Sequence, residues 1–102
     1  MAVTLLDGAT SDGAGPEYVR AAPRPGDRRL TGTLFVTGTP DGATAGIELT
    51  PDGINWLRPA DLTFTTPGAT NIEIWCHAFR GYVSGSGTGT SLDVTLFTEQ
   101  YG

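Results

Sequence analysis

The one cysteine and the one histidine of this chain, Cys76 and His77, are adjacent in the sequence. A thiol and an imidazole can act together as nucleophile and general base when their side chains meet. In a strand, however, neighbouring side chains point to opposite faces, which separates the two groups. We therefore expect a packed thiol and an ordinary surface or edge histidine, with a turn or bulge near His77.

Four carboxylates on or near predicted strands could act in pairs, as carboxylates do in glycoside hydrolysis. An active pair needs a cleft that sets the separation of its two carboxyl groups, and the sequence indicates no cleft. We therefore expect these side chains to lie on solvated strand faces. They are Glu48, Asp61, Glu73 and Asp93.

Metal and nucleotide sites with a recognisable spacing are missing from the sequence. It has no HExxH, CxxC, GxGxxG or P-loop pattern. The Asp-Gly turns could supply oxygen ligands to Ca²⁺, but no segment matches the twelve-residue calcium loop with its closing glutamate. The sequence thus predicts no catalytic residue, no metal site and no cofactor, and we do not expect an enzyme.

An arginine-rich loop is the first candidate for contact with a partner. Arg24, Arg28 and Arg29 lie in a stretch with two prolines and a glycine, which no strand interior or helix would tolerate. The loop could bind a phosphate or an acidic partner. Alternatively, its three charges are solvated and balance the nearby Asp27 and Glu17.

Three aromatic side chains are the second candidate, namely Trp75, Tyr82 and Tyr101. Flat aromatic rings stack on pyranose sugars, so these residues could line a sugar-binding face. Aromatic residues in strands are more often part of a core or of a subunit interface. The sequence leaves both interpretations open.

Composition and charge narrow the function further. The 102 residues suffice for about one domain with a real core. The net charge is −5 and all six basic residues are arginines, so phosphate backbones have little to bind. The single cysteine cannot form an internal disulfide, and neither a membrane-spanning apolar run nor a signal-peptide pattern is present. We expect a soluble protein made in the cytoplasm, without direct contact with nucleic acid or membrane.

Short strands are the elements that must position these residues. Alternating or clustered apolar residues mark about eight segments, spaced roughly eight to twelve residues apart, and no window has a helical period. The segments are residues 2–6, 17–20, 30–37, 45–50, 62–65, 71–75, 79–83 and 91–97. This pattern predicts an all-β fold, a single β-sandwich or jelly-roll-like domain over residues 1–102, with mainly antiparallel strands.

A turn and a large aromatic residue meet at Asp52, Gly53 and Trp56. Asp52 and Gly53 can take the positive backbone angles of a tight hairpin turn. A buried tryptophan removes much apolar surface from water, so we expect Trp56 to anchor the core. Phe35 falls on the second face of its strand, which indicates that this face is also covered. Residues 84–90, rich in Gly, Ser and Thr, are expected to be flexible.

Four motifs along the chain resemble those of the small β-sandwich proteins of tailed-bacteriophage virions. They are an LLDGAT strand at residues 5–10, a GTLFVTGT strand at 32–39, a DG-x-NW turn at 52–56 and an FR-x-x-V strand at 79–83, followed by a Gly/Thr-rich final hairpin. The resemblance spans nearly the whole chain. It implies a virion structural protein, either a decoration or cement protein of the capsid, a head or tail fibre module, or a neck component.

Of these positions we favour the capsid. The implied partners are the major capsid protein or other virion proteins, together with further copies of the chain in a trimer or another symmetric assembly. Such a protein would be made in the host cytoplasm and would stabilise the head by binding only the assembled lattice. Residues 1–6 and 97–102 are natural arms for pairing with a neighbour's strand. The alternative is a carbohydrate-binding or adhesin-like module of a phage fibre or tail.

Overall fold

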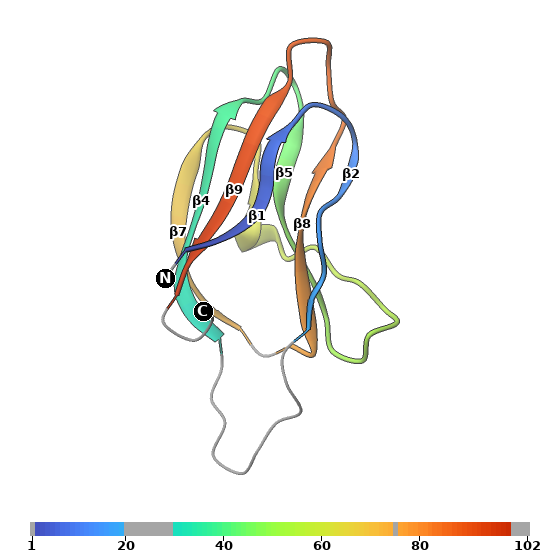
Figure 1. Cartoon of the computed structure of the whole chain (residues 1–102), viewed down its shortest axis with the longest axis vertical. Coiled ribbons are helices and arrows are strands. Elements are labelled where there is room, and N and C mark those ends of the chain that lie inside the picture. Colours follow the sequence, from blue (N-terminus) through green and yellow to red (C-terminus); the bar gives the residue numbers. More distant parts are fainter. Residues whose placement is uncertain (1, 20–29, 75, 99–102) are drawn as a thin grey trace.

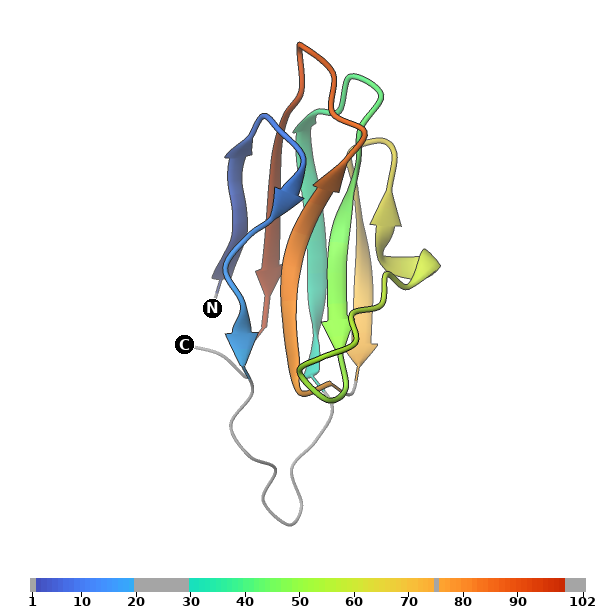
Figure 2. The same cartoon turned by 90° about the vertical axis from the view of Figure 1, so that its right-hand side faces the viewer.

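The computed structural model describes residues 2–19, 30–74 and 76–98, and the strands in these ranges form two antiparallel sheets (Figure 1). The first sheet has the order β1-β9-β4-β7, and the second has the order β2-β8-β5-β6, with β3 also paired to β8. Figure 2 looks onto the second sheet, with the strands of the first sheet behind it. The structure confirms the predicted all-β sandwich.

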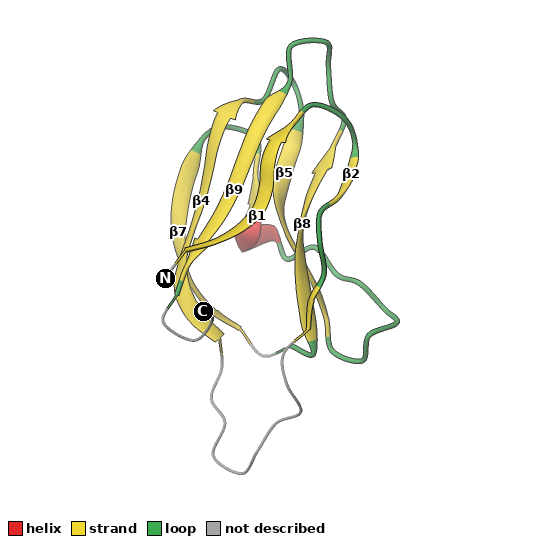
Figure 3. Ribbon diagram, viewed as in Figure 1, coloured by secondary structure: helices red, strands yellow, loops and turns green. Residues whose placement is uncertain are grey.

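Eight of the nine described strands overlap the eight predicted segments, whereas the two-residue strand Gly13–Ala14 lies where no strand was predicted. The strand predicted at residues 2–6 continues to Ala9, and the one predicted at 71–75 begins at Gly68. The first sheet contains β1 (Ala2–Ala9), β9 (Ser91–Phe97), β4 (Leu30–Thr39) and β7 (Gly68–Ile74). The second contains β2 (Gly13–Ala14), β3 (Tyr18–Val19), β8 (Ala78–Ser84), β5 (Thr44–Thr50) and β6 (Thr63–Phe64). β2 and β3 pair with opposite ends of β8, so together they fill one edge position and each sheet is four strands wide. Within the described ranges the only helical segment is η1 (Ala60–Leu62), one 3-10 turn (Figure 3).

The core lies between the sheets and is built from alternate strand residues. In β9 the buried residues Leu92, Val94 and Leu96 alternate with partly or fully exposed ones, and β4 contributes Leu34 and Val36 in the same way. Each such side chain contributes roughly 1.5–3 kcal/mol when it is fully removed from water. The facing sheet supplies Ala45, Ile47, Phe79 and Val83 to the same cluster.

β1 is an integral strand of the domain. Its residues pair with β9 from Ala2 opposite Phe97 onward. Val3 and Leu5 are 8% and 0% exposed, so they belong to the core. The expectation that residues 1–6 form an arm is therefore wrong for the described residues 2–6, because their alternate apolar side chains are needed between the sheets.

The described end of the chain is also part of the domain. The Thr98 hydroxyl donates a hydrogen bond of 2.7 Å to the carbonyl of Thr31, and Thr98 is only 4% exposed. The remaining residues of the predicted C-terminal arm, 99–102, lie outside the described ranges.

Two Asp-Gly turns behave differently. At the connection from β4 to β5, Asp41 and Gly42 both have positive φ, 48° and 85°, and the Ala43 N–H bonds to the Pro40 carbonyl at 3.0 Å. This tight turn carries the chain from one sheet to the other. At Asp52-Gly53 only the glycine has positive φ, 82°. The second turn is thus present, but it belongs to a wider loop than the predicted tight hairpin.

The segment around Cys76 also crosses between the sheets, since β7 and β8 belong to different ones. Cys76 is 8% exposed and joins the core cluster, whereas His77 is exposed and donates its backbone N–H to the Thr50 carbonyl at 2.8 Å. The predicted packed thiol, surface histidine and interruption near His77 are confirmed. Period-2 alternation fails there because the chain leaves one sheet for the other.

The Gly-, Ser- and Thr-rich loop between β8 and β9 is anchored by two carboxylates. Asp12 accepts the Ser86 N–H and Asp41 accepts the Gly89 N–H, each at 2.7 Å. These partners are far away in the sequence, so composition alone, which predicted flexibility, could not indicate them.

Candidate functional site

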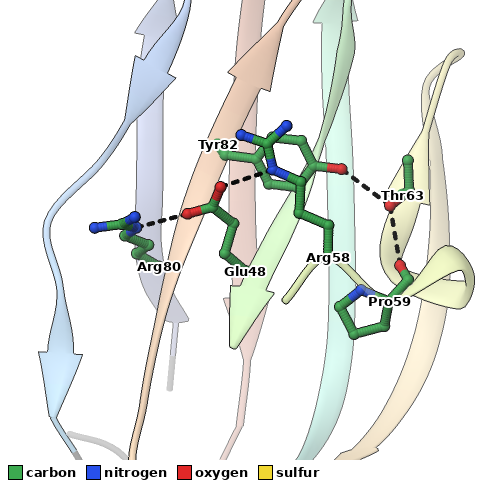
Figure 4. A network of polar contacts seen from close by, with 6 residues as sticks. All are labelled: Glu48, Arg58, Pro59, Thr63, Arg80 and Tyr82. Carbon is green, nitrogen blue, oxygen red and sulfur yellow. Dashed lines mark hydrogen bonds and ion pairs between the residues drawn. The ribbon is translucent and has the colours of Figure 1, made fainter. Parts of the chain in front are cut away.

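A buried carboxylate between two arginines dominates the outer face of the second sheet (Figure 4). Glu48 on β5 is 5% exposed and lies directly opposite Arg80 on β8. One carboxylate oxygen accepts the Nε–H of Arg58 and the other accepts the Nε–H of Arg80, both at 2.7 Å. The expectation of a solvated Glu48 is therefore wrong, because the segment after β5 folds back and covers it.

Each arginine also stacks on an aromatic ring. The guanidinium carbon of Arg58 lies 4.2 Å from the centre of the Tyr82 ring, and that of Arg80 lies 3.9 Å from the centre of the Trp56 ring. Such cation–π contacts contribute about 0.5–2 kcal/mol. They hold both guanidinium groups in fixed orientations.

Tyr82 is not available as a surface ligand contact. It is 1% exposed, and its hydroxyl shares a hydrogen bond of 2.9 Å with the Thr63 hydroxyl. Its ring points to the outer face of the sheet, as a sugar platform requires, but Arg58 and the β6 segment cover it (Figure 4). The prediction of Tyr82 as a partner contact is therefore wrong for this single chain.

Trp56 is not a core anchor. It is partly exposed and lies outside the core cluster, against Arg80. The loop that follows β5 runs over the outside of the sheet, so its tryptophan packs on an arginine there instead of entering the space between the sheets. The Asp52-Gly53-Trp56 motif thus closes an outer surface.

The electrostatics of Glu48 follow from this enclosure. Burial alone would raise the pKa of its carboxyl group, because it penalises the charged form. Hydrogen bonds from Arg80 and Arg58, together with their positive charges, outweigh burial, and the pKa of Glu48 lies below its usual value. Glu48 is therefore ionised at neutral pH and acts as the anionic centre of an ion-pair cluster.

Asp52 organises the loop that carries Trp56. Its carboxylate accepts the backbone N–H groups of Asn55 at 2.9 Å and Ile54 at 2.8 Å, and the Asn55 side-chain amide at 2.8 Å. These hydrogen bonds hold the pKa of Asp52 well below its usual range. The loop closes where Leu49 and Leu57 exchange two backbone hydrogen bonds of 2.8 Å.

A second candidate surface lies on the outer face of the first sheet. Phe35 on β4 and Phe97 on β9 are 38% and 48% exposed, and their rings meet edge to face with centres 5.2 Å apart. Their cross-strand neighbours form two rows across the sheet, in which none of the eight residues is charged. The rows are Ala2–Phe97–Thr33–Asn71 and Thr4–Thr95–Phe35–Ala69.

Among the described residues, acidic side chains lie at the two ends of this uncharged face. The next cross-strand pairs are Thr31 with Glu73 and Thr37 with Asp93. The sequence analysis identified Phe35 as a residue on the second face of its strand but did not identify Phe97. Phe97 occupies a position of β9 at which the alternation predicts a polar residue, and this departure could have indicated it. Phe35 does not lie under a covering segment of its own chain, so the expectation that this face is covered is unmet within the described residues.

The four carboxylates of the sequence do not converge on one site. Glu48 lies on the second sheet, whereas Glu73 and Asp93 face outward from the first. Asp61 is exposed on η1, and Asp93 accepts the Gly8 N–H at 2.7 Å. Across the described ranges, no three or more His, Cys, Asp or Glu side chains are grouped so that they could hold a metal ion.

The other predicted contacts cannot be placed. Arg24, Arg28, Arg29, Trp75 and Tyr101 lie outside the described residues.

In the part of the chain that is described, no helix has the length and apolar character needed to cross a membrane. Comparison with protein-family models, with curated proteins and with solved structures finds no match to this chain.

Proposed function

We propose that this chain is a non-enzymatic structural protein of a tailed-phage virion, and specifically a decoration or cement protein of the mature head. The motifs at residues 5–10, 32–39, 52–56 and 79–83 support the virion assignment through their resemblance to small phage sandwich proteins. The observation that carries the proposal is the uncharged outer face that displays Phe35 and Phe97.

That face has the character of a protein-contact surface. Two adjacent aromatic rings are surrounded by small neutral side chains, while the whole chain carries a net charge of −5. The centres of protein interfaces are rich in aromatic residues and poor in charges.

Stabilisation by mass action is the proposed mechanism. A protein that binds the assembled, expanded lattice and not its separated subunits shifts the lattice away from rupture without making or breaking a bond. The partners are the major capsid protein or other virion proteins, and further copies of the chain, with a trimer favoured. The protein is made in the host cytoplasm and resides on the virion surface.

The alternative is a carbohydrate-binding or adhesin-like module of a fibre or tail. Its candidate sugar contacts are Trp75, Tyr82 and Tyr101, and Tyr82 is buried beneath Arg58. The alternative therefore has lost one of its three aromatic contacts.

Co-sedimentation tests the proposed role. Mature heads of the parent phage that lack this protein are mixed with increasing amounts of the purified chain, whose own mass is measured by light scattering. Saturable, stoichiometric binding by a small oligomer supports the decoration role. Absence of binding to heads, with saturable binding to tails or to glycans instead, rejects it and favours the fibre or adhesin role.

A further inference from the structure

The two arginines of the Glu48 cluster each use only a small part of their hydrogen-bonding capacity. A guanidinium group has five N–H donors, one on Nε and four on its two Nη atoms. Arg58 and Arg80 both donate to Glu48 through Nε. No described residue accepts a hydrogen bond from their Nη atoms, so both outer ends of these groups are available to a ligand.

Both groups are already ordered. Glu48 fixes each Nε, and Tyr82 and Trp56 hold the flat faces of Arg58 and Arg80. A free arginine side chain loses about 2 kcal/mol of rotamer entropy when it is fixed. Here most of that entropy is lost when the chain folds, so little more is lost when a ligand binds.

The site also has the right charge for an anion. Two arginines and one glutamate leave the cluster with one net positive charge, in a chain whose net charge is −5. The side chains of Arg58 and Arg80 are 51% and 27% exposed, so a ligand can reach them. A carboxylate matches the planar fork of an arginine with two parallel hydrogen bonds.

An exposed apolar side chain on the same loop points to a protein ligand. Ile54 is 79% exposed and lies two residues before Trp56, which stacks on Arg80. The loop that carries it is fixed by the Leu49–Leu57 hydrogen bonds and by the Asp52 carboxylate. An inorganic anion gains nothing from an exposed isoleucine, whereas a peptide with an apolar residue beside its carboxylate buries it.

We propose that Arg58 and Arg80, with the exposed Ile54 on the loop that carries Trp56, form a docking site for an acidic segment of a partner protein. A glutamate or aspartate of that segment binds the free Nη donors, and a neighbouring apolar side chain packs on Ile54. The proposal does not depend on the virion role, and this surface belongs to the sheet opposite the one that displays Phe35 and Phe97.

Titration of the ¹⁵N-labelled full chain with short peptides tests the site by nuclear magnetic resonance. The probes are N-acetyl-Leu-Glu-Leu-amide, the matching peptide with Gln in place of Glu, and inorganic phosphate. We expect saturable shifts of the Arg58 and Arg80 Nε–Hε signals with the Glu peptide, and about tenfold weaker binding of the Gln peptide. No saturable shift up to about 10 mM, equal binding of the Gln peptide, or phosphate binding as tight as that of the Glu peptide would overturn the proposal.

Three variants locate the effect. Arg58→Gln should weaken binding of the Glu peptide about tenfold, since it removes one charged fork and leaves the Glu48–Arg80 pair. Ile54→Ser keeps both ion pairs and should also weaken binding, so the test survives if Arg58→Gln does not fold. Phe97→Ser on the other sheet is the control and should leave peptide binding unchanged. Equal binding by the wild type and Ile54→Ser would contradict the predicted apolar contact.

Discussion

Glu48 organises the side chains on the outer face of the second sheet. Two arginines and, through them, two aromatic rings are oriented around its buried carboxylate. A buried charge without a partner destabilises the folded state, whereas a buried carboxylate that accepts hydrogen bonds from two charged donors is compensated. The same arrangement that stabilises the buried Glu48 carboxylate therefore holds Arg58 and Arg80 in place.

Replacement of Glu48 by glutamine should destabilise the fold. The amide has one acceptor oxygen, so at least one arginine loses a charged hydrogen bond and faces an amide N–H₂ group. We expect the free energy of unfolding to fall by about 2 kcal/mol, the size of a hydrogen bond to a charged group with part of the arginine still in water. Urea unfolding at pH 7 measures the difference.

The matched control is Asp61→Asn, which makes the same chemical change at an exposed position on η1. It should alter the free energy of unfolding by no more than about 0.5 kcal/mol. Equal effects of the two substitutions would show that the ion-pair cluster does not stabilise the fold.

Stability should fall in acid because three carboxylates have lowered pKa values. They are Glu48, held by its arginines, Asp52, held by the Asn55 and Ile54 N–H groups, and Asp12, held by Ser86. Their pKa values are lower in the folded chain than in the unfolded chain, so below about pH 5 the unfolded chain binds more protons. Their contribution is complete above that pH and is lost as the pH falls through the folded-state values.

Urea midpoints between pH 7 and pH 3 measure this dependence. The wild type should lose stability steadily below about pH 5, and Asp52→Asn should show a shallower loss since one of the three groups no longer titrates. A stability that is constant or rises from pH 5 to pH 3 would contradict the lowered pKa values.

At the scale of the element, β5 is the strand whose side chains are buried on both of its faces. Its inner residues Ala45 and Ile47 are in the core, while Gly46, Glu48 and Thr50 on its outer side are buried as well. Alternation of apolar and polar residues predicted a strand with one solvated face. The outer face is covered by residues 56–63 instead, a contact between segments that no local pattern specifies.

Gly46 allows that cover to lie against β5. A Cβ atom at this position would be 2.0 Å from the carbonyl oxygen of Leu62, closer than any real contact. Gly46→Ala should therefore displace η1 and reduce the free energy of unfolding by about 2 kcal/mol, a typical result of overpacking. Urea unfolding measures the loss of stability, and increased nitration of Tyr82 would report the lost cover.

Gly68→Ala provides the comparison within the same fold. A Cβ atom there would lie 3.3 Å from the ring of Phe64, a side chain that can move, and not against backbone. We expect a clearly smaller loss of stability than for Gly46→Ala. The packing explanation fails if the two alanine variants are equally stable.

Local patterns predicted the strands better than their partners. Residues 91–97 were predicted to the residue because Leu92, Val94 and Leu96 alternate cleanly. Strand order could not be predicted, since β1 pairs with β9 from the other end of the chain. The Glu48 cluster was missed for the same reason, as Arg58 and Arg80 lie 10 and 32 residues from their common partner.

At the scale of the whole molecule, the sandwich presents two different outer surfaces. The first sheet displays an uncharged face around Phe35 and Phe97, and the second displays arginines ordered around Glu48. A sandwich with two such surfaces can contact protein on both sides. The sequence supplied the sandwich, but only the cross-strand register brought Phe97 beside Phe35 and thereby defined the first surface.

The most direct test of the central claim compares head binding by the wild type, Phe35→Ser/Phe97→Ser and Phe35→Leu/Phe97→Leu in the same co-sedimentation series. All three chains should remain folded without urea, which circular dichroism checks, because both rings lie outside the core between the sheets. We predict that the serine variant loses head binding at least about tenfold, while the leucine variant, which keeps an apolar face, retains most of it. Full binding by the serine variant would contradict the assignment of this face as the virion contact.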